Sequence, residues 1–243
     1  MTRPGDPLAF EDLVDDYDAA RPHYPAELFD ALGVLGTTLE LGAGTGIASV
    51  ELAARARLVV SDLGPRMLAR GLAKHGSPAV VCRAERLPFA DKAFDTVCGA
   101  QMWHWTDPEA GPEVHRVLRD GGRLLLWWNE SDADGQPGGS AWWDAQQDRL
   151  EAGNPSYQRG YREVDYNAQL AGLFDTQAPE LFRWSRTISL ELYGRWLRSK
   201  SYVQKLPDVD GFVTACLDDL RQVFPDGQVE EPFVTRLWRF TRR

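Results

Sequence analysis

Three glycines stand at alternate positions at the end of the stretch TTLELGAGTG, residues 37–46. They follow a short apolar run that contains the acidic Glu40. Because glycine loses more conformational entropy on folding than any other residue, such a cluster is typical of backbone that a ligand approaches closely. The alternative is a tight strand-to-helix turn that binds no ligand. The cluster consists of Gly42, Ala43, Gly44, Thr45 and Gly46.

A second candidate for ligand binding is Asp62, which ends the apolar stretch LVVSD twenty positions after Gly42. An acidic side chain at that distance from a glycine turn can reach a ribose. Its carboxylate would accept charge-assisted hydrogen bonds from both the 2′- and the 3′-hydroxyl. The alternative role for Asp62 is to cap the helix predicted to start in GPRML.

The glycine spacing argues against a dinucleotide site. The dinucleotide fingerprint is G-x-G-x-x-G, and its third glycine lets the helix pack closely against the strand. Ile47 stands at that third position here. A nucleotide-dependent oxidoreductase is therefore only a distant alternative.

These motifs belong to a chain in which short apolar strands alternate with helical segments. Such alternation predicts βαβ units and a parallel sheet that helices cover on both faces. After residue 130 the sequence changes to a polar, glycine-rich loop and aromatic-rich helices, with further strands near 180–190 and 232–241. Before that point, strands are predicted at 37–41, 58–62, 79–84, 94–100 and 123–129, and helices at 47–56, 65–76 and 113–122.

Several longer motifs accompany the glycine stretch in a fixed order. YDAARPHYP precedes ELGAGTG, and VVSDLGPRML, AERLPFADKAFDTV, GAQMWHWTD and HRVLRDGGRLLLW follow it. In this order they resemble the class I S-adenosylmethionine-dependent methyltransferases of type 11. YDAARPHYP and the His-Trp pair are similar to a subgroup that includes trans-aconitate methyltransferase-like enzymes. The resemblance implies S-adenosyl-L-methionine as cofactor and S-adenosyl-L-homocysteine as product.

The resemblance and the strand pattern together imply an α/β fold. Its sheet would be Rossmann-like and doubly wound, with seven mostly parallel strands and an antiparallel last strand. Residues 1–243 are expected to form a single methyltransferase domain. It would comprise an N-terminal helical cap (1–35), a cofactor-binding core (36–130) and a helical substrate cover (131–178 and 190–228).

The resemblance also assigns contacts to the methionine part of the cofactor. Glu40 would pair with its ammonium group, or else satisfy loop amides at the end of a strand. Ala100 and Gln101 would offer backbone groups. Tyr17 and Arg21 lie four positions apart, hence on one face of a helix, and by the resemblance would close over the cofactor. Arg21 would pair with the cofactor's carboxylate.

Contacts to the adenine are assigned in the same way. Leu63 and Met67 would sandwich the ring, or else pack only in the core. Ala84 and Glu85 follow the third strand, where the family recognises the adenine edge. Arg83 stands where many relatives have Asp, so the contact to the adenine amino group is expected from Glu85.

His104 is the candidate catalytic residue, because the resemblance places it near the transferred methyl group and imidazole titrates near neutrality. It would act as a general base, or else hold the loop as a structural histidine. His23 is a weaker candidate, and His75 and His115 are expected on outer helices. No group of Asp, Glu and His has metal-ligand spacing, so no metal is predicted.

The expected reaction is methyl transfer to a small acceptor by in-line displacement at the sulfonium. O-methylation of a carboxylate or a hydroxyl is favoured. A carboxylate would need no base, whereas a hydroxyl would benefit from one. Aromatic residues in the expected cover indicate an apolar or aromatic acceptor. They are Trp142, Trp143, Tyr157, Tyr161, Tyr166, Trp196 and Tyr202.

The composition narrows the choice of partners. A net charge of −9 and a pI near 5.0 argue against nucleic-acid binding and hence against an RNA methyltransferase. The long late insertions disfavour a protein methyltransferase, which would need an open groove. No membrane span or signal peptide is predicted. The three cysteines suggest neither a disulfide framework nor a zinc site. A cytoplasmic monomer or homodimer is expected.

Overall fold

The computed structural model describes residues 18–132, 141–157 and 165–243. By its internal contacts the chain forms two compact units. The sheet unit consists of His23–Asn129, Val164–Phe182 and Thr235–Arg243. The helical unit consists of Met1–Pro22, Glu130–Glu163 and Arg183–Val234. Tyr17 and Tyr161, both predicted to line the site, lie outside the described residues.

Parallel strands form the main part of the sheet unit, as the sequence predicts. Their order is β3-β2-β1-β4-β5, and each neighbouring pair is parallel. Two of them coincide with the predicted strands 37–41 and 94–100, whereas β3 is shorter than the predicted 79–84. The bounds are β1 (Thr37–Leu41), β2 (Arg57–Asp62), β3 (Ala79–Val81), β4 (Phe94–Ala100) and β5 (Leu118–Ser131).

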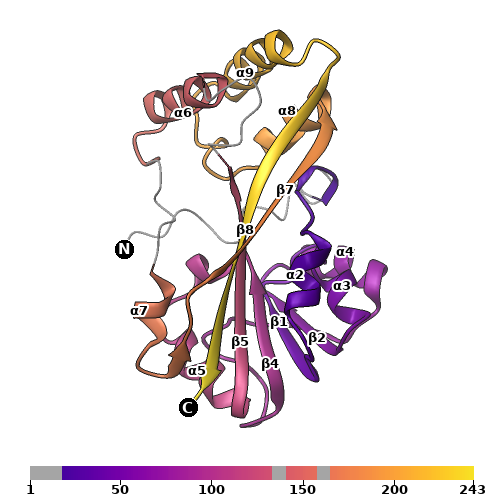
Figure 1. The fold of residues 1–243 in the computed structure, drawn as a ribbon, viewed down its shortest axis with the longest axis vertical. Helices are drawn as coiled ribbons and strands as arrows, with labels where there is room; N and C mark the ends of the chain where they lie inside the picture. The colour runs from indigo at the N-terminus through magenta and orange to yellow at the C-terminus, as the bar shows by residue number, and fades with distance from the viewer. Residues whose placement is uncertain (1–17, 133–140, 158–164) are drawn as a thin grey trace. The chain divides into compact units, whose positions relative to one another are not determined.

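The strand order reverses between β1 and β4. β2 and β3 continue the sheet on one side of β1, and β4 and β5 continue it on the other, as Figure 1 shows for the labelled strands. At the carboxyl end of β1, Leu41 pairs with Ser61 of β2 and with Gly99 of β4. Open α/β sheets bind ligands at such a reversal point. The glycine stretch 42–46 therefore begins where a ligand is expected.

Three more strands belong to the same sheet: β6 (Phe174–Thr176), β7 (Glu180–Ser189) and β8 (Gln228–Arg242). β6 runs antiparallel to β8, so the predicted mixed sheet with an antiparallel end is confirmed. The described residues contain eight strands rather than the seven predicted. The additional strand is β6. Because only its first residue is buried, it has no apolar run that the sequence could reveal.

Side chains of β5 alternate between two hydrophobic cores. Leu124, Leu126 and Trp128 belong to a core that also includes residues of α5 (Ala110–Val117) and α7 (Tyr166–Leu170). Leu125 and Trp127 belong to another core. That core includes residues of α2 (Ala26–Ala31), α3 (Ser49–Ala53) and α4 (Pro65–His75). Since successive strand side chains point to opposite faces, helices cover both faces of the sheet.

The end of α5 differs from the sequence prediction. The predicted helix 113–122 ends at its two glycines, but α5 ends at Val117 and β5 begins at Leu118. Leu118 is fully buried and pairs with Phe94 of β4. The register then shifts before Thr96 pairs with Arg123, and within this shift Gly121 has a φ of +69°. The glycines therefore permit an irregularity in a strand instead of ending a helix.

The helical unit is built from α6 (Ala141–Gly153), α8 (Leu190–Arg198) and α9 (Val209–Val223). Its hydrophobic core includes Trp142, Tyr193 and Trp196. The expected cover segment 131–178 divides between the two units, because α7 belongs to the sheet unit. There the Tyr166 ring stacks on Trp128 with 4.8 Å between centroids. Among the described helices, none has both the length and the apolar character needed to cross a membrane.

Candidate functional site

The glycine stretch forms a tight turn directly after β1. Gly42, Gly44 and Gly46 have φ values of +60°, +55° and +79°. Residues other than glycine adopt this backbone conformation only at a cost in free energy. The Ala43 N–H donates to Ser61 O of β2 at 3.0 Å, and the Gly46 N–H donates to Ala43 O at 2.9 Å. These bonds fix the turn against the neighbouring strand.

The three glycines differ in what surrounds them. A Cβ on Gly42 would lie 2.6 Å from Met102 Cβ, and one on Gly46 would lie 3.0 Å from the backbone of Gly71 in α4. A Cβ on Gly44 would make an ordinary contact, at 3.5 Å from Met67 Cε. Protein atoms therefore leave no room for a side chain at Gly42 or Gly46, whereas a Cβ on Gly44 would clash with none of the described residues.

Asp62 connects this turn to the end of β2. Its Oδ2 accepts from the Gly44 N–H and its Oδ1 accepts from the Gly64 N–H, both at 2.8 Å. Two amides, one on each oxygen, therefore fix the orientation of the carboxylate beside the turn. The alternative that Asp62 caps the following helix is wrong, because α4 has Gly64 at its N-cap and no side-chain capping bond.

Glu40 lies inside the protein, at only 1% exposure. The Ser49 hydroxyl of α3 donates to its Oε2 at 2.6 Å. Burial raises the pKa of Glu40 from 4.5 to about 8, the Ser49 hydrogen bond opposes this shift, and the charge of Asp62 adds to it. The carboxyl is therefore largely protonated at neutral pH, and its contact with a cofactor ammonium group stays a prediction.

The predicted adenine contacts surround the ends of β2 and β3. Met67 is buried in α4 with its methyl beside Gly44, and Leu63 is partly exposed. Ala84 is partly buried against the core that contains α5. The Glu85 carboxylate already has protein partners, because its Oε1 accepts from the Asp107 N–H at 2.7 Å and its Oε2 lies 3.4 Å from Arg83 Nε.

The segment after β4 holds the other predicted site residues of the sheet unit. Ala100 is partly buried, and Gln101 has a φ of +54°, a conformation that costs a residue other than glycine about 1–3 kcal/mol. The Gln101 N–H donates to Trp127 O at 2.9 Å. Such local strain is common at functional sites, although it assigns no ligand by itself.

His104 lies in a short 3-10 helix, η1 (Trp103–Trp105), directly after this segment. Its ring centroid is 5.0 Å from that of Trp105 and 6.3 Å from that of Trp128. Trp103 is buried in the core, which anchors the turn. The imidazole is partly buried among aromatic rings, an arrangement compatible with either predicted role.

Other predicted residues lie elsewhere. Arg21 belongs to the helical unit, where its Nη2 donates to Ser199 O at 3.1 Å. His23 accepts through its backbone oxygen from Asn129 Nδ2 at 2.8 Å. His75 and His115 are on α4 and α5, as expected for outer helices. In the described part of the chain, no group of three His, Cys, Asp or Glu side chains is arranged to hold a metal ion.

Two residues of this region were not foreseen from the sequence. Ser49 holds the Glu40 carboxyl, and Met102 fills the space beside Gly42. The sequence gives no signal for Ser49, because its position on the first turn of a helix is common for serine. Met102 is adjacent to the predicted catalytic turn, so an apolar residue at that position is the only signal that could have indicated it.

Residues 39–126 match a protein-family model described as a methyltransferase domain. An uncharacterized methyltransferase of Mycobacterium tuberculosis is 44% identical over 130 residues, which are 51% of this chain and 54% of that protein. A malonyl-[acyl-carrier protein] O-methyltransferase of Herminiimonas arsenicoxydans is 35% identical over 128 residues, 49% of each chain. The aligned part of this chain thus spans about half the length of these curated relatives.

The fold is similar to that of solved proteins over a longer stretch. The structure of a protein from Anaeromyxobacter dehalogenans, described as a type II methyltransferase, aligns with a TM-score of 0.69. The alignment covers 92% of this chain and 97% of that one at 22% sequence identity. At this identity the likeness concerns the fold alone.

Proposed function

We propose that this chain, whose residues 39–126 match a methyltransferase-domain model, is a class I S-adenosylmethionine-dependent enzyme that binds S-adenosyl-L-methionine and methylates a small acceptor. One observation carries the proposal: the amides of Gly44 and Gly64 hold the Asp62 carboxylate directly beside Gly44, where an added Cβ would clash with no described residue. This arrangement lies at the strand-order reversal, where a nucleoside-bearing ligand is expected.

The described residues suit the parts of this cofactor. Asp62 would accept from the ribose hydroxyls, and the turn at Gly44 would let the methionine moiety approach the backbone. The apolar side chains of Leu63 and Met67 would lie against the adenine, with Ala84 at its edge. When bound, the cofactor supplies a sulfonium that is already an activated electrophile. The protein must therefore bind the cofactor and the acceptor, orient them toward each other and exclude water from the site.

The favoured acceptor is a carboxylate or hydroxyl on a small molecule. The name of the Herminiimonas relative gives oxygen as the methylated atom on a malonyl group, and this supports an oxygen acceptor. Partly buried aromatic residues of the helical unit, Trp143, Tyr157 and Tyr202, support an apolar or aromatic acceptor. Trp142 and Trp196 support it less, because both are buried in the core of that unit.

His104 would act differently with the two kinds of acceptor. A carboxylate is already ionised at neutral pH and needs no base, so His104 would only orient it. A hydroxyl must lose its proton as the new bond forms, and the imidazole of His104 would accept that proton. We favour the orienting role, in line with a carboxylate acceptor.

Ligand binding separates this proposal from its alternatives. A ligand that binds only the folded state raises the apparent melting temperature. We expect S-adenosylhomocysteine to raise it, and NAD and NADP to leave it unchanged. Incubating the protein and a metabolite extract with methyl-deuterated cofactor, and then finding the labelled product by mass, identifies the acceptor. A labelled protein or RNA in place of a small molecule would contradict the proposed acceptor class.

Asp62→Ala tests the assignment of the ribose contact. Loss of charge-assisted hydrogen bonds should weaken S-adenosylhomocysteine binding by about 2–3 kcal/mol, roughly 30- to 150-fold. Calorimetry measures the affinity, and circular dichroism checks the fold. Asp175→Ala is the control, because Asp175 is an exposed residue of β6. Unchanged affinity in a folded Asp62→Ala variant would remove Asp62 from the binding site.

A further inference from the structure

The segment that follows β3 is held at its start by β2. The Cys82 N–H donates to Asp62 O at 3.1 Å. The chain then makes a tight turn, in which the Arg86 N–H donates to Arg83 O at 3.1 Å. Ala84 and Glu85 stand at the centre of this turn. The predicted adenine contacts are therefore attached directly to the strand that ends in the predicted ribose contact.

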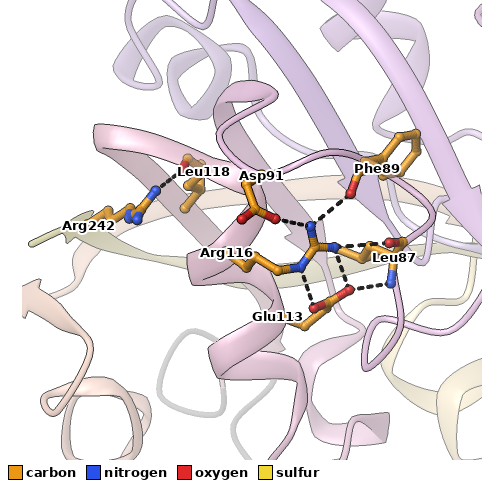
Figure 2. Close-up of polar contacts among 7 residues, drawn as sticks. All are labelled: Leu87, Phe89, Asp91, Glu113, Arg116, Leu118 and Arg242. Atoms are coloured by element: carbon orange, nitrogen blue, oxygen red, sulfur yellow. Dashed lines mark hydrogen bonds and ion pairs between the residues drawn. The ribbon is translucent and has the colours of Figure 1, made fainter.

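The same segment is held at its far end by α5, as Figure 2 shows. Arg116 donates to Leu87 O at 3.1 Å, to Phe89 O at 2.8 Å and to the Asp91 carboxylate at 2.6 Å. The Glu113 carboxylate accepts from the Leu87 N–H at 2.7 Å and from two nitrogens of Arg116 at 2.8 and 2.9 Å. With both ends fixed, the turn at 83–86 has little freedom to move.

Glu85 extends from this fixed turn to a different segment of the sheet unit. Its Oε1 accepts from the Asp107 N–H at 2.7 Å, two residues beyond the 3-10 helix that carries His104. Arg83 lies between the two acidic side chains, with its Nε 3.4 Å from Glu85 Oε2 and its Nη2 3.7 Å from Asp107 Oδ2. The Glu85 side chain is only 14% exposed.

Arg83 is close enough to both acidic side chains to offset their charges. An Asp at this position would bring a third carboxylate next to Glu85 and Asp107, whereas Arg83 offsets both charges. Arg83 and Asp107 are each nearly half exposed, so their ion pair contributes little. The charge-assisted hydrogen bond from the Asp107 amide to Glu85 is the stronger link.

We propose that Glu85 is a positioning residue that connects the segment Cys82–Asp91 to the turn at Met102–Asp107, and so holds His104 relative to the cofactor. In this role it is not the partner of the adenine amino group. The position of the side chain supports this role, because its Oε1 accepts from the Asp107 amide, its Oε2 lies beside the Arg83 guanidinium, and only 14% of it is exposed. That Glu85 holds His104 relative to the cofactor rests on the proposed function, since it requires a cofactor beside Ala84.

Amide hydrogen exchange of residues 102–107, measured with and without S-adenosylhomocysteine, tests the connection. In Glu85→Ala the region should exchange about tenfold or more faster, because the Asp107 amide loses a charge-assisted bond. Glu85→Gln keeps an acceptor oxygen and should restore most of the protection. Glu109→Ala is the matched control, because it removes an exposed carboxylate two residues from Asp107 and should leave exchange unchanged.

The ligand distinguishes a positioning role from an adenine contact. In the wild type, S-adenosylhomocysteine should slow exchange at 102–107. In Glu85→Ala it should bind within about threefold of the wild-type affinity but no longer slow that exchange, since the link is lost. In calorimetry, a loss of tenfold or more in affinity, with exchange at 102–107 unchanged, would assign Glu85 to the adenine and overturn the proposal. Unchanged exchange in a folded Glu85→Ala variant would overturn it as well.

A different result would contradict the proposed function rather than the role of Glu85. A wild-type chain that does not bind S-adenosylhomocysteine would overturn that function and the catalytic consequence for Glu85. The exchange rates of the ligand-free variants would still decide whether Glu85 holds the turn, because the Glu85–Asp107 bond is present without any ligand.

Discussion

At the scale of single residues, the glycines of the turn have different tasks although the sequence presents them as equivalent. Gly42 makes room for Met102 and Gly46 makes room for α4, whereas a Cβ on Gly44 would only make an ordinary contact with Met67. The sequence could predict that the turn exists, because glycine tolerates positive φ. It could not predict at which glycine a side chain would clash, since Met102 and Gly71 approach from distant positions in the chain.

Substituting alanine at Gly44 and at Gly42 separates these tasks. Both positions have similar positive φ values, so each alanine costs about 1–2 kcal/mol of backbone strain. Gly42→Ala should be less stable by about 1–3 kcal/mol more, because its methyl would collide with Met102. Gly44→Ala should keep its fold and lose S-adenosylhomocysteine affinity by tenfold or more. Urea titration and calorimetry measure the two effects, and normal affinity in Gly44→Ala would mean that the glycine serves only the turn.

His104→Gln reports on the acceptor as well as on the histidine. With a carboxylate acceptor we expect kcat to fall less than about tenfold, with the larger effect in KM, because no proton must be removed. With a hydroxyl acceptor kcat should fall by about 10²–10⁴-fold. The wild-type rate should then decrease at acid pH, because the imidazole becomes protonated, and the variant should not show this decrease. Steady-state rates across pH decide between them. In either case cofactor affinity should stay nearly unchanged, and a large loss of affinity would contradict both roles.

At the scale of elements, the strands that the sequence predicts best are those with continuous apolar runs. β1 and β4 match their predicted bounds, whereas β6 and the end of α5 do not. The reason is physical: β6 has a single buried residue, and Leu118 becomes part of β5 because it pairs with Phe94 far away in the sequence. The hydrophobic pattern of a segment indicates which of its residues are buried. It does not indicate which strand, distant in the sequence, will pair with that segment.

The network around Arg116 is an element-scale feature that the sequence could not reveal. Its acceptors at Leu87, Phe89 and Asp91 are 25 to 29 positions away. Arg116→Lys keeps the charge but cannot reach all of these acceptors from one planar group. It should lower the free energy of unfolding by about 1–3 kcal/mol, since backbone carbonyls lose their donors.

The control for Arg116→Lys is Lys92→Ala. Lys92 pairs with Asp120 at 2.6 Å, but both side chains are more than half exposed. Its removal should change the free energy of unfolding by less than about 1 kcal/mol. Urea denaturation compares the two variants. Equal and small losses would show that the hydrogen bonds of Arg116 contribute no more than a surface ion pair.

At the scale of the whole molecule, the site predictions divide between the two units. The predicted cofactor residues that the structure describes belong to the sheet unit, apart from Arg21. Sequence motifs could predict where these residues lie, because they follow strands whose order the family resemblance implies, and their contacts with a cofactor stay predictions. The acceptor side could not be predicted in the same way, because aromatic residues serve hydrophobic cores as readily as pockets. Tyr166 illustrates this, since it packs on Trp128 in the sheet unit.

The pH dependence of stability also belongs to the whole molecule, and Glu40 makes a definite contribution to it. In the folded chain its pKa is raised from 4.5 to about 8, chiefly by burial. Between these two values the folded state binds more protons than the unfolded state, so the free energy of unfolding decreases as pH rises through this range. At about 1.4 kcal/mol for each unit of pKa shift, the loss is on the order of several kcal/mol.

Urea denaturation of the wild type and of Glu40→Gln at pH 5.5 and pH 8 tests this contribution. The glutamine side chain cannot ionise, so the variant should lose less stability between the two pH values than the wild type, while other titrating groups cancel in the comparison. Glu113→Gln is the control, because hydrogen bonds from Arg116 lower the pKa of Glu113. The stability that this carboxylate contributes is lost only at lower pH, as the pH falls through its folded pKa, so its substitution should have the same effect at both values. Identical pH dependence in the wild type and in Glu40→Gln would mean that Glu40 is ionised in the folded chain throughout this range, and that its burial is compensated by partners other than Ser49.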